Sequence, residues 1–123
     1  INKVCYSIKV HRWSPEQNLK TIEAKILQDA DRLDALGAVD VARVIASSFQ
    51  TEKYKRSVYV DSDYEGASDK SKSAWHYLMY KTKQPKRNPD NFNTEIGREI
   101  AKKRYEFSKM YVERFKKEWH GII

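Results

Sequence analysis

The chain has 123 residues, of which 40% are hydrophobic and 12% aromatic, so collagen-like, low-complexity and wholly disordered classes are excluded. No stretch approaches the roughly 18 consecutive apolar residues of a membrane-spanning helix. The 24 lysines and arginines outnumber the 17 acidic residues, and the formal net charge of +7 favours anionic partners. The single cysteine, Cys5, cannot form an internal disulfide, so a reducing, cytoplasmic location is expected.

Hydrophobic spacing predicts helices over the first half of the chain. In residues 1–13, Val4, Ile8 and His11 recur on one helical face, so His11 is expected to point the same way as the apolar side chains. Residues 21–36 carry the clearest helical signal, a stripe that is expected to face the core and comprises Ile22, Ile26, Ala30 and Leu33. Gly37 either interrupts this helix or allows close packing, and residues 39–49 are expected to continue as a largely apolar helix.

The second half of the chain alternates between polar and helical segments. Residues 50–72 are polar and are expected to form an exposed excursion, whereas residues 71–83 predict a further helix. A last helix is expected from near Asn93, a good N-cap residue, to about Trp119, with Gly121 just beyond its end. No internal repeat and no second domain are visible, so the sequence predicts one all-α domain over residues 1–123, or the greater part of one.

Three carboxylates stand out on the helix predicted for residues 21–36. On a helical wheel Glu23 and Asp34 fall inside the apolar arc, and Asp31 falls at its edge. Burying ionised carboxylates is costly unless cations or hydrogen bonds compensate. Two interpretations follow: lysines or arginines pair with these groups or this end of the helix is exposed, or a divalent metal needs their oxygens. Spacing alone favours the first, because structural ion pairs are commoner than metal sites.

The stretch TIEAKILQDADRLDALGA at 21–38 closely resembles the HD-domain superfamily of metal-dependent phosphohydrolases, and most of all its bacterial subgroup of small hydrolases. The stretch VHRWS at 10–14 and residues 93–119 agree with that subgroup in order and spacing. The resemblance implies a helical bundle of the HD type that hydrolyses a phosphomonoester or phosphodiester, with a nucleotide as one candidate. It also implies a divalent metal cofactor, namely Mn, Mg, Fe, Ni or Zn.

The resemblance also implies roles for individual residues. Asp31 corresponds to a metal ligand and, with Arg32, to a catalytic position, whereas Asp29 is the rival ligand if the register differs by two residues. His11 corresponds to a histidine close to the substrate phosphate or to a second metal. Asp34 is expected to lie near the substrate. The implied partner is a phosphorylated small molecule or nucleotide. No membrane partner is expected.

The sequence departs from the family pattern because no His-Asp doublet occurs in it. In the family that doublet lies on helices upstream of the position where this chain begins, at Ile1 rather than at a methionine. We therefore expect the chain to be the C-terminal portion of an HD-type domain and, in isolation, to lack appreciable phosphohydrolase activity. Asp40 also stands where a small or apolar residue is expected.

A second hypothesis is a non-catalytic, HD-like scaffold that binds RNA or another polyanion through its basic surface. Two basic clusters, at 53–56 and 81–87, support it. Tyr54 lies within the first cluster and Tyr59 follows it, and such aromatic rings could stack on the bases of a single strand. A solvated surface is the favoured interpretation of these clusters, because no known nucleic-acid fold accompanies them. Nucleic acid is therefore the less favoured partner.

Overall fold

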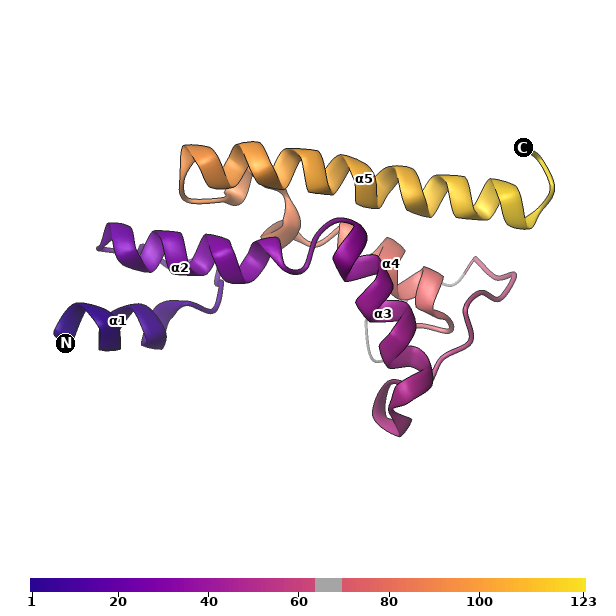
Figure 1. Ribbon diagram of the computed structural model, residues 1–123, viewed down its shortest axis with the longest axis horizontal. Helices are drawn as coiled ribbons and strands as arrows, with labels where there is room; N and C mark the ends of the chain where they lie inside the picture. Colours follow the sequence, from indigo (N-terminus) through magenta and orange to yellow (C-terminus); the bar gives the residue numbers. More distant parts are fainter. Residues whose placement is uncertain (64–69) are drawn as a thin grey trace.

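The computed structural model describes residues 1–63 and 70–123, which contain five α-helices and no β-strand. The helices are α1 (Asn2–Val10), α2 (Ile22–Leu33), α3 (Ala38–Gln50), α4 (Ala74–Thr82) and α5 (Glu95–Trp119). The predicted all-α class is confirmed. Helix α5 extends along most of the molecule, with α2 beside its first half and α3 and α4 beside its second half, while α1 packs on α2 (Figure 1). No helix in the described part of the chain is long and apolar enough to span a bilayer.

Short turns connect the helices and form part of the site described below. The single-turn 3₁₀ helices η3 (Pro85–Arg87) and η4 (Pro89–Asn91) link α4 to α5, and η1 (Glu52–Tyr54) follows α3. Helix α5 is capped by Thr94, whose Oγ1 accepts a hydrogen bond from the Gly97 amide at 3.0 Å, one residue later than the predicted Asn93. Its predicted end at Trp119 is confirmed, and Gly121 follows with a φ of 66°.

Two clusters of buried apolar residues hold the helices together. The larger cluster joins α3, α4 and the second half of α5 and contains Val41, Val44, Tyr59, Ala74, Trp75, Leu78 and Val112. The smaller cluster joins the end of α2 to the first half of α5 and contains Leu36, Phe92 and Ala101. Each half of α5 therefore has its own core, and the end of α2 lies against the smaller one.

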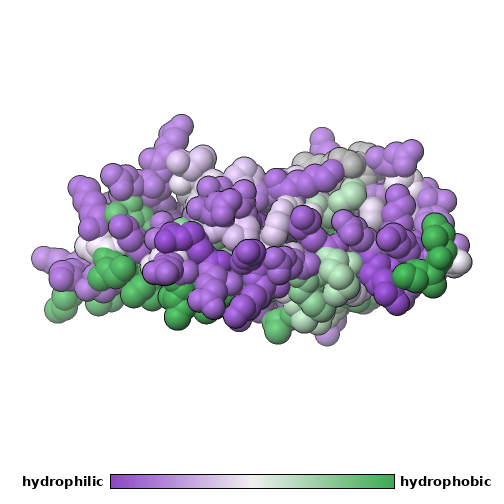
Figure 2. Space-filling model, turned by 90° about the horizontal axis from the view of Figure 1, so that it is seen from above, coloured by the Kyte–Doolittle hydropathy of each residue, from purple (hydrophilic) through white to green (hydrophobic). Residues whose placement is uncertain are grey.

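Three of the four residues in the apolar stripe of α2, Ile22, Ile26 and Ala30, face solvent, so the expectation that the stripe faces the core was wrong for them; Leu33 packs against the smaller cluster as expected. Ile22 and Ile26 are 58% and 54% exposed, and Val4 on α1 is 60% exposed. Apolar side chains gather along one edge of the end of the molecule that holds α1 and α2 (Figure 2). The buried residues of α2 are instead mostly polar and include Gln28 and Arg32. Hydrogen bonds to the η3–α5 region, rather than apolar packing, hold this face in place.

The carboxylates within the predicted apolar arc are exposed for the same reason. Glu23 lies 3.8 Å from Lys3 Nζ, and Asp34 lies 3.9 Å from Arg43 Nη2, with both carboxylate side chains at least half exposed. Surface pairs of this kind contribute about 0–1 kcal/mol to stability. The ion-pair and exposed-end interpretation therefore fits both residues.

Asp40, which stands where the resemblance predicts a small or apolar residue, forms a buried ion pair between α3 and α4. Its Oδ1 lies 2.5 Å from Lys81 Nζ, and the two side chains are only 7% and 8% exposed. A charge buried on one helix is thus matched by a charge buried on the next. This pairing explains how a carboxylate can occupy a position where an apolar side chain was expected.

The predicted excursion at 50–72 is only partly an exposed segment, and residues 64–69 of it lie outside the described residues. Before the gap, Tyr59 is 6% exposed and packs against Trp75, with ring centroids 5.4 Å apart. An isolated bridge joins Ser57 to Ser73, and the Trp75 amide donates to the Val58 carbonyl at 3.0 Å. Tyr59 therefore belongs to the larger core, and backbone hydrogen bonds join residues 57 and 58 to the start of α4.

Candidate active site

A pocket of about 300 Å³ lies where the connection between α1 and α2, the end of α2 and the η3 turn meet. Its lining combines cations, one carboxylate and an indole ring, and comprises Arg12, Trp13, Asp31, Arg32, Ala35, Lys86 and Arg87. The structure thus brings Asp31 and Arg32, both singled out from the sequence, into one pocket. Asp31 is exposed, so its carboxylate is accessible to a ligand.

Arg32 is buried and holds the wall of this pocket together. Its guanidinium carbon lies 3.9 Å from the centroid of the Phe92 ring and 5.4 Å from that of Trp13. Its Nε donates to the Lys86 carbonyl at 2.8 Å, and its Nη1 donates to the Asn91 carbonyl at 2.9 Å. These contacts attach η3 and η4 to α2. Arg32 is therefore a positioning residue, and its expected catalytic role stays a prediction.

The cations around the pocket repel one another. Burial lowers the pKa of Arg32 to about 10, Asp29 raises it in part, and Arg87 lowers it again. Burial also lowers the pKa of Lys86, which Arg87 lowers further and Asp31 raises. The pKa of Arg87 is lowered chiefly by burial too. A bound anion would relieve this repulsion, so the charges suit a negatively charged ligand.

Within the described residues, Arg87 has an unpaired hydrogen-bond donor. Its Nε is buried and has no hydrogen-bond partner in the described part of the chain. A buried donor without an acceptor costs about 1–3 kcal/mol. Arg87 also belongs to the pocket lining, so a small shift of its guanidinium group would bring this donor within reach of an oxygen atom of a bound anion.

The two residues expected to bind substrate lie outside the pocket lining. His11 is half-buried just after α1, where its Nδ1 lies 2.5 Å from a backbone carbonyl oxygen of that helix. The Asp34 side chain is 70% exposed and lies beside Arg43. The neighbours of His11, Arg12 and Trp13, line the pocket instead. A substrate contact by His11 or Asp34 stays a prediction.

Asp29, the rival metal ligand, is fully occupied by hydrogen bonds. Its Oδ1 accepts from the backbone and side-chain nitrogens of Asn93, both at 2.9 Å, and its Oδ2 accepts from Thr94 N and Oγ1 at 2.8 and 2.7 Å. A Cβ added at Gly97 would lie only 2.4 Å from the same Oδ2. Four donors use the lone pairs of one carboxylate, so the geometry favours Asp31 over Asp29 as a ligand.

The described residues do not by themselves form the metal centre that the resemblance implies. Within 1–63 and 70–123, no three His, Cys, Asp or Glu side chains lie close enough together to hold a metal ion. Among the described residues, Asp31 is the one carboxylate in the pocket lining. Because a protein metal site generally uses three or more protein ligands, Asp31 could supply at most part of such a set.

The other histidines have structural surroundings. His76 is 1% exposed, with Nδ1 2.7 Å from Ser73 Oγ and Nε2 2.9 Å from the Ser62 carbonyl. His120 Nε2 lies 3.2 Å from the hydroxyl of Tyr59. The tyrosine is buried, so it offers no stacking surface for a nucleic-acid base. These contacts agree with packing rather than with ligation.

Besides Ala35, sequence reasoning missed the four other charged or aromatic residues of the pocket. Arg12 and Trp13 lie within the stretch that resembles the HD subgroup, and their adjacency to His11 was the available signal. Lys86 and Arg87 were recognised only as members of the basic cluster at 81–87, which was interpreted as a solvated surface. Folding brings them to Asp31 from a distant part of the chain.

Comparison with known proteins shows a distant similarity. No family model matches the chain. Over 102 residues, which are 83% of this chain, it is 32% identical to the uncharacterized protein YpgQ of Bacillus subtilis (strain 168). The match covers 42% of that relative, so the chain spans less than half of its length. The chain is therefore a distant relative of part of YpgQ.

Proposed function

We propose that this chain is part of a metal-dependent phosphohydrolase of the HD superfamily that acts on a phosphomonoester or phosphodiester, with a nucleotide as one candidate substrate. The observation that carries the proposal is the pocket in which an exposed carboxylate, Asp31, adjoins Arg12, Lys86 and Arg87. Phosphohydrolases need cations to bind the phosphoryl oxygens and a carboxylate near the scissile bond. The resemblance at 21–38 supports the same assignment.

Each residue of the pocket has a proposed task. Arg12 and Arg87 would bind phosphoryl oxygens through charge-assisted hydrogen bonds, and Lys86 would add a further positive charge. Arg32 would keep these cations in position, because its own nitrogens already donate to the carbonyls of η3 and η4. Trp13 would exclude water from one side of the bound group.

Asp31 would supply one metal ligand, and the remaining ligands would have to come from outside the described residues. A divalent ion in such enzymes lowers the pKa of a bound water and so provides hydroxide near neutral pH. Since one carboxylate does not retain an ion against water, we expect the 123-residue chain alone to be inactive. Metal-dependent turnover by that chain, lost in Asp31→Ala, would contradict this expectation.

The first test is Mn²⁺ titration calorimetry on the longest natural form of the protein. Asp31→Ala should weaken Mn²⁺ binding by about 100-fold or more, because a direct ligand matters at least as much as its supporting residues. Glu23→Ala removes another exposed carboxylate of α2, outside the pocket, and should leave Mn²⁺ binding unchanged. Equal affinities of the two variants would remove Asp31 from the metal site.

The cations are tested by kinetics on a phosphate ester in the same full-length protein. Arg12→Gln and Arg87→Gln should each raise KM by about 10- to 100-fold, the loss of a hydrogen bond to a charged group. Lys53→Gln removes an exposed cation outside the pocket and serves as the matched control. A KM that stays within twofold of the wild-type value in both arginine variants would exclude them as phosphoryl contacts.

The alternative function is a scaffold that binds RNA or another polyanion without chemistry. It is favoured by the same cationic pocket together with the lack of a three-residue ligand group in the described part of the chain. RNA affinity that falls steeply with salt, combined with no Mn²⁺ binding by the longest natural form, would support it.

A further inference from the structure

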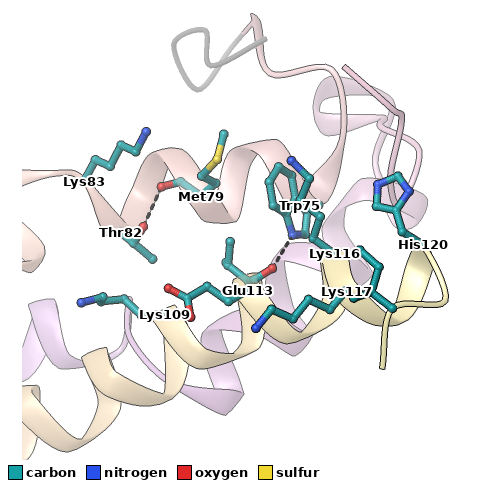
Figure 3. Close-up of a pocket in the computed structure, with 11 residues that line it drawn as sticks. Trp75, Met79, Thr82, Lys83, Lys109, Glu113, Lys116, Lys117 and His120 are labelled. Carbon is teal, nitrogen blue, oxygen red and sulfur yellow. Dashed lines mark hydrogen bonds between the residues drawn. The ribbon is translucent and has the colours of Figure 1, made fainter. Parts of the chain in front are cut away.

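A second pocket lies between α4 and the second half of α5, at the opposite end of the molecule from α1. Its volume is about 560 Å³, and Figure 3 shows that its residues come from α4 and from the facing part of α5, with His120 beyond the end of α5. Eleven residues line it: Trp75, Met79, Thr82, Lys83, Lys109, Val112, Glu113, Lys116, Lys117, His120 and Ile122. None of them belongs to the pocket around Asp31. A volume of this size suits a small organic ligand.

The floor of the pocket is apolar and its polar atoms already have partners. Trp75 and Val112 are 6% and 8% exposed, and the indole Nε1 donates to the Val112 carbonyl at 2.8 Å (Figure 3). Thr82 Oγ1 donates to the Met79 carbonyl at 2.7 Å. These bonds fix the positions of the floor residues and leave them no unsatisfied donor. The floor would therefore contact the apolar part of a ligand.

The rim of the pocket is positively charged. Four lysines lie on it, three of them from α5, against the single carboxylate of Glu113. The Lys116 ammonium lies 5.5 Å from the centroid of the Trp75 ring, so it is held over the floor. Lysine stems extend the apolar surface while their charged ends reach solvent. The pocket therefore combines an apolar floor with a positive rim.

We propose that this pocket binds a small amphiphilic anion, with an apolar chain or ring on the Trp75–Val112 floor and a carboxylate or phosphate head group beside Lys109, Lys116 and Lys117. The apolar part would gain burial against Met79, and the head group would be attracted by the excess of cations. The proposal does not depend on phosphohydrolase activity, because the two pockets share no residue.

The test is NMR titration of the longest natural form of the protein, labelled at its methionine methyl groups, with decanoate at monomeric concentrations. Met79 lines the pocket whereas Met110 does not, so the Met79 signal should shift and the Met110 signal should stay in place. Decyl phosphate replaces decanoate in a second titration, and the tighter of the two ligands identifies the head group. Decyltrimethylammonium should bind at least about tenfold more weakly, because its charge is reversed.

Two matched variants separate the rim from general charge effects. Lys109→Gln with Lys117→Gln removes two rim cations and should weaken decanoate binding by about five- to tenfold. Lys53→Gln with Lys103→Gln removes two exposed cations outside the pocket and should leave the affinity unchanged. Equal affinities for decanoate and the cationic probe, equal effects of the two double variants, or no shift of Met79 with either anion would overturn the proposal.

Discussion

Replacing Asp40 by alanine should destabilise the protein by about 3–5 kcal/mol, the usual cost of removing one partner from a buried ion pair. The Lys81 ammonium would remain buried without its partner on α3. Burial lowers the pKa of Lys81, Asp40 raises it, and Arg87 and Arg43 lower it again. In the variant only the unfavourable contributions remain, so the charged lysine opposes folding.

The loss of stability in the Asp40 variant should decrease as the pH rises. Burial already holds the pKa of Lys81 below its ordinary value of 10.5, and the loss of Asp40 lowers it further. At pH values between the pKa of Lys81 in the folded chain and its higher pKa in the unfolded chain, the unfolded chain binds more protons than the folded chain. The free energy of unfolding therefore rises with pH in this range. The variant should therefore gain more stability than the wild type as the pH approaches 10.5.

Urea unfolding of the longest natural form, followed by circular dichroism, measures both effects. Glu99→Ala removes one partner of an exposed pair on α5 and should change the free energy of unfolding by less than about 0.5 kcal/mol. The double variant Asp40→Leu with Lys81→Met replaces the pair by apolar groups and should regain most of the wild-type stability. If Asp40→Ala unfolds at the same urea concentration as Glu99→Ala, the buried pair does not stabilise the fold.

The second large effect is expected at Asp29. Its removal by alanine should cost about 2–4 kcal/mol, because charge-assisted hydrogen bonds at the start of α5 lose their acceptor. The change would also remove the carboxylate that raises the pKa of Arg32. We therefore expect η3 and η4 to loosen and phosphate-ester binding to weaken together with the loss of stability.

Thermal unfolding and amide hydrogen exchange check the Asp29 prediction. Protection should fall first at Asn93 and Thr94, whose amides donate to the carboxylate. Asp34→Ala serves as the control, since that carboxylate is exposed near the end of the same helix. Unchanged protection at Thr94 in the Asp29 variant would show that the carboxylate does not hold the start of α5.

The positions of the helices could be predicted from the sequence because their ends carry local signals. The start of α5 was predicted within one residue, since a side chain that accepts a hydrogen bond from an amide three residues later is a short-range feature. The stripe Ile22, Ile26, Ala30 and Leu33 was also a valid helical signal for α2. Periodicity therefore located the elements correctly.

The direction in which α2 faces could not be predicted from its own residues. A helical wheel identifies an apolar face, but it does not show which face meets the rest of the chain. In this chain the buried face uses Gln28, Asp29 and Arg32, each of which has a hydrogen-bond partner 54 to 65 residues later in the chain. Hydrogen bonds of this length in sequence become visible only when the chain has folded.

The candidate site could also be predicted only in part. Asp31 and Arg32 were identified through a local stretch of sequence, and the structure places both in the pocket. Lys86 and Arg87 have no distinctive spacing of their own, because they are two basic residues in a turn after a proline. Their position in the pocket depends on Arg32, which attaches that turn to α2.

The close approach of Gly97 to Asp29 restricts how this protein can change during evolution. Any side chain at 97 would collide with the carboxylate, and any shortening of residue 29 would leave the amides at the start of α5 without an acceptor. Natural variants that keep Asp29 and Thr94 should therefore keep Gly97. Because the added Cβ would also lie 2.7 Å from Thr94 Oγ1, position 97 should tolerate alanine only in sequences where position 29 carries a smaller residue and position 94 also differs, and an alignment of relatives should show these positions changing together.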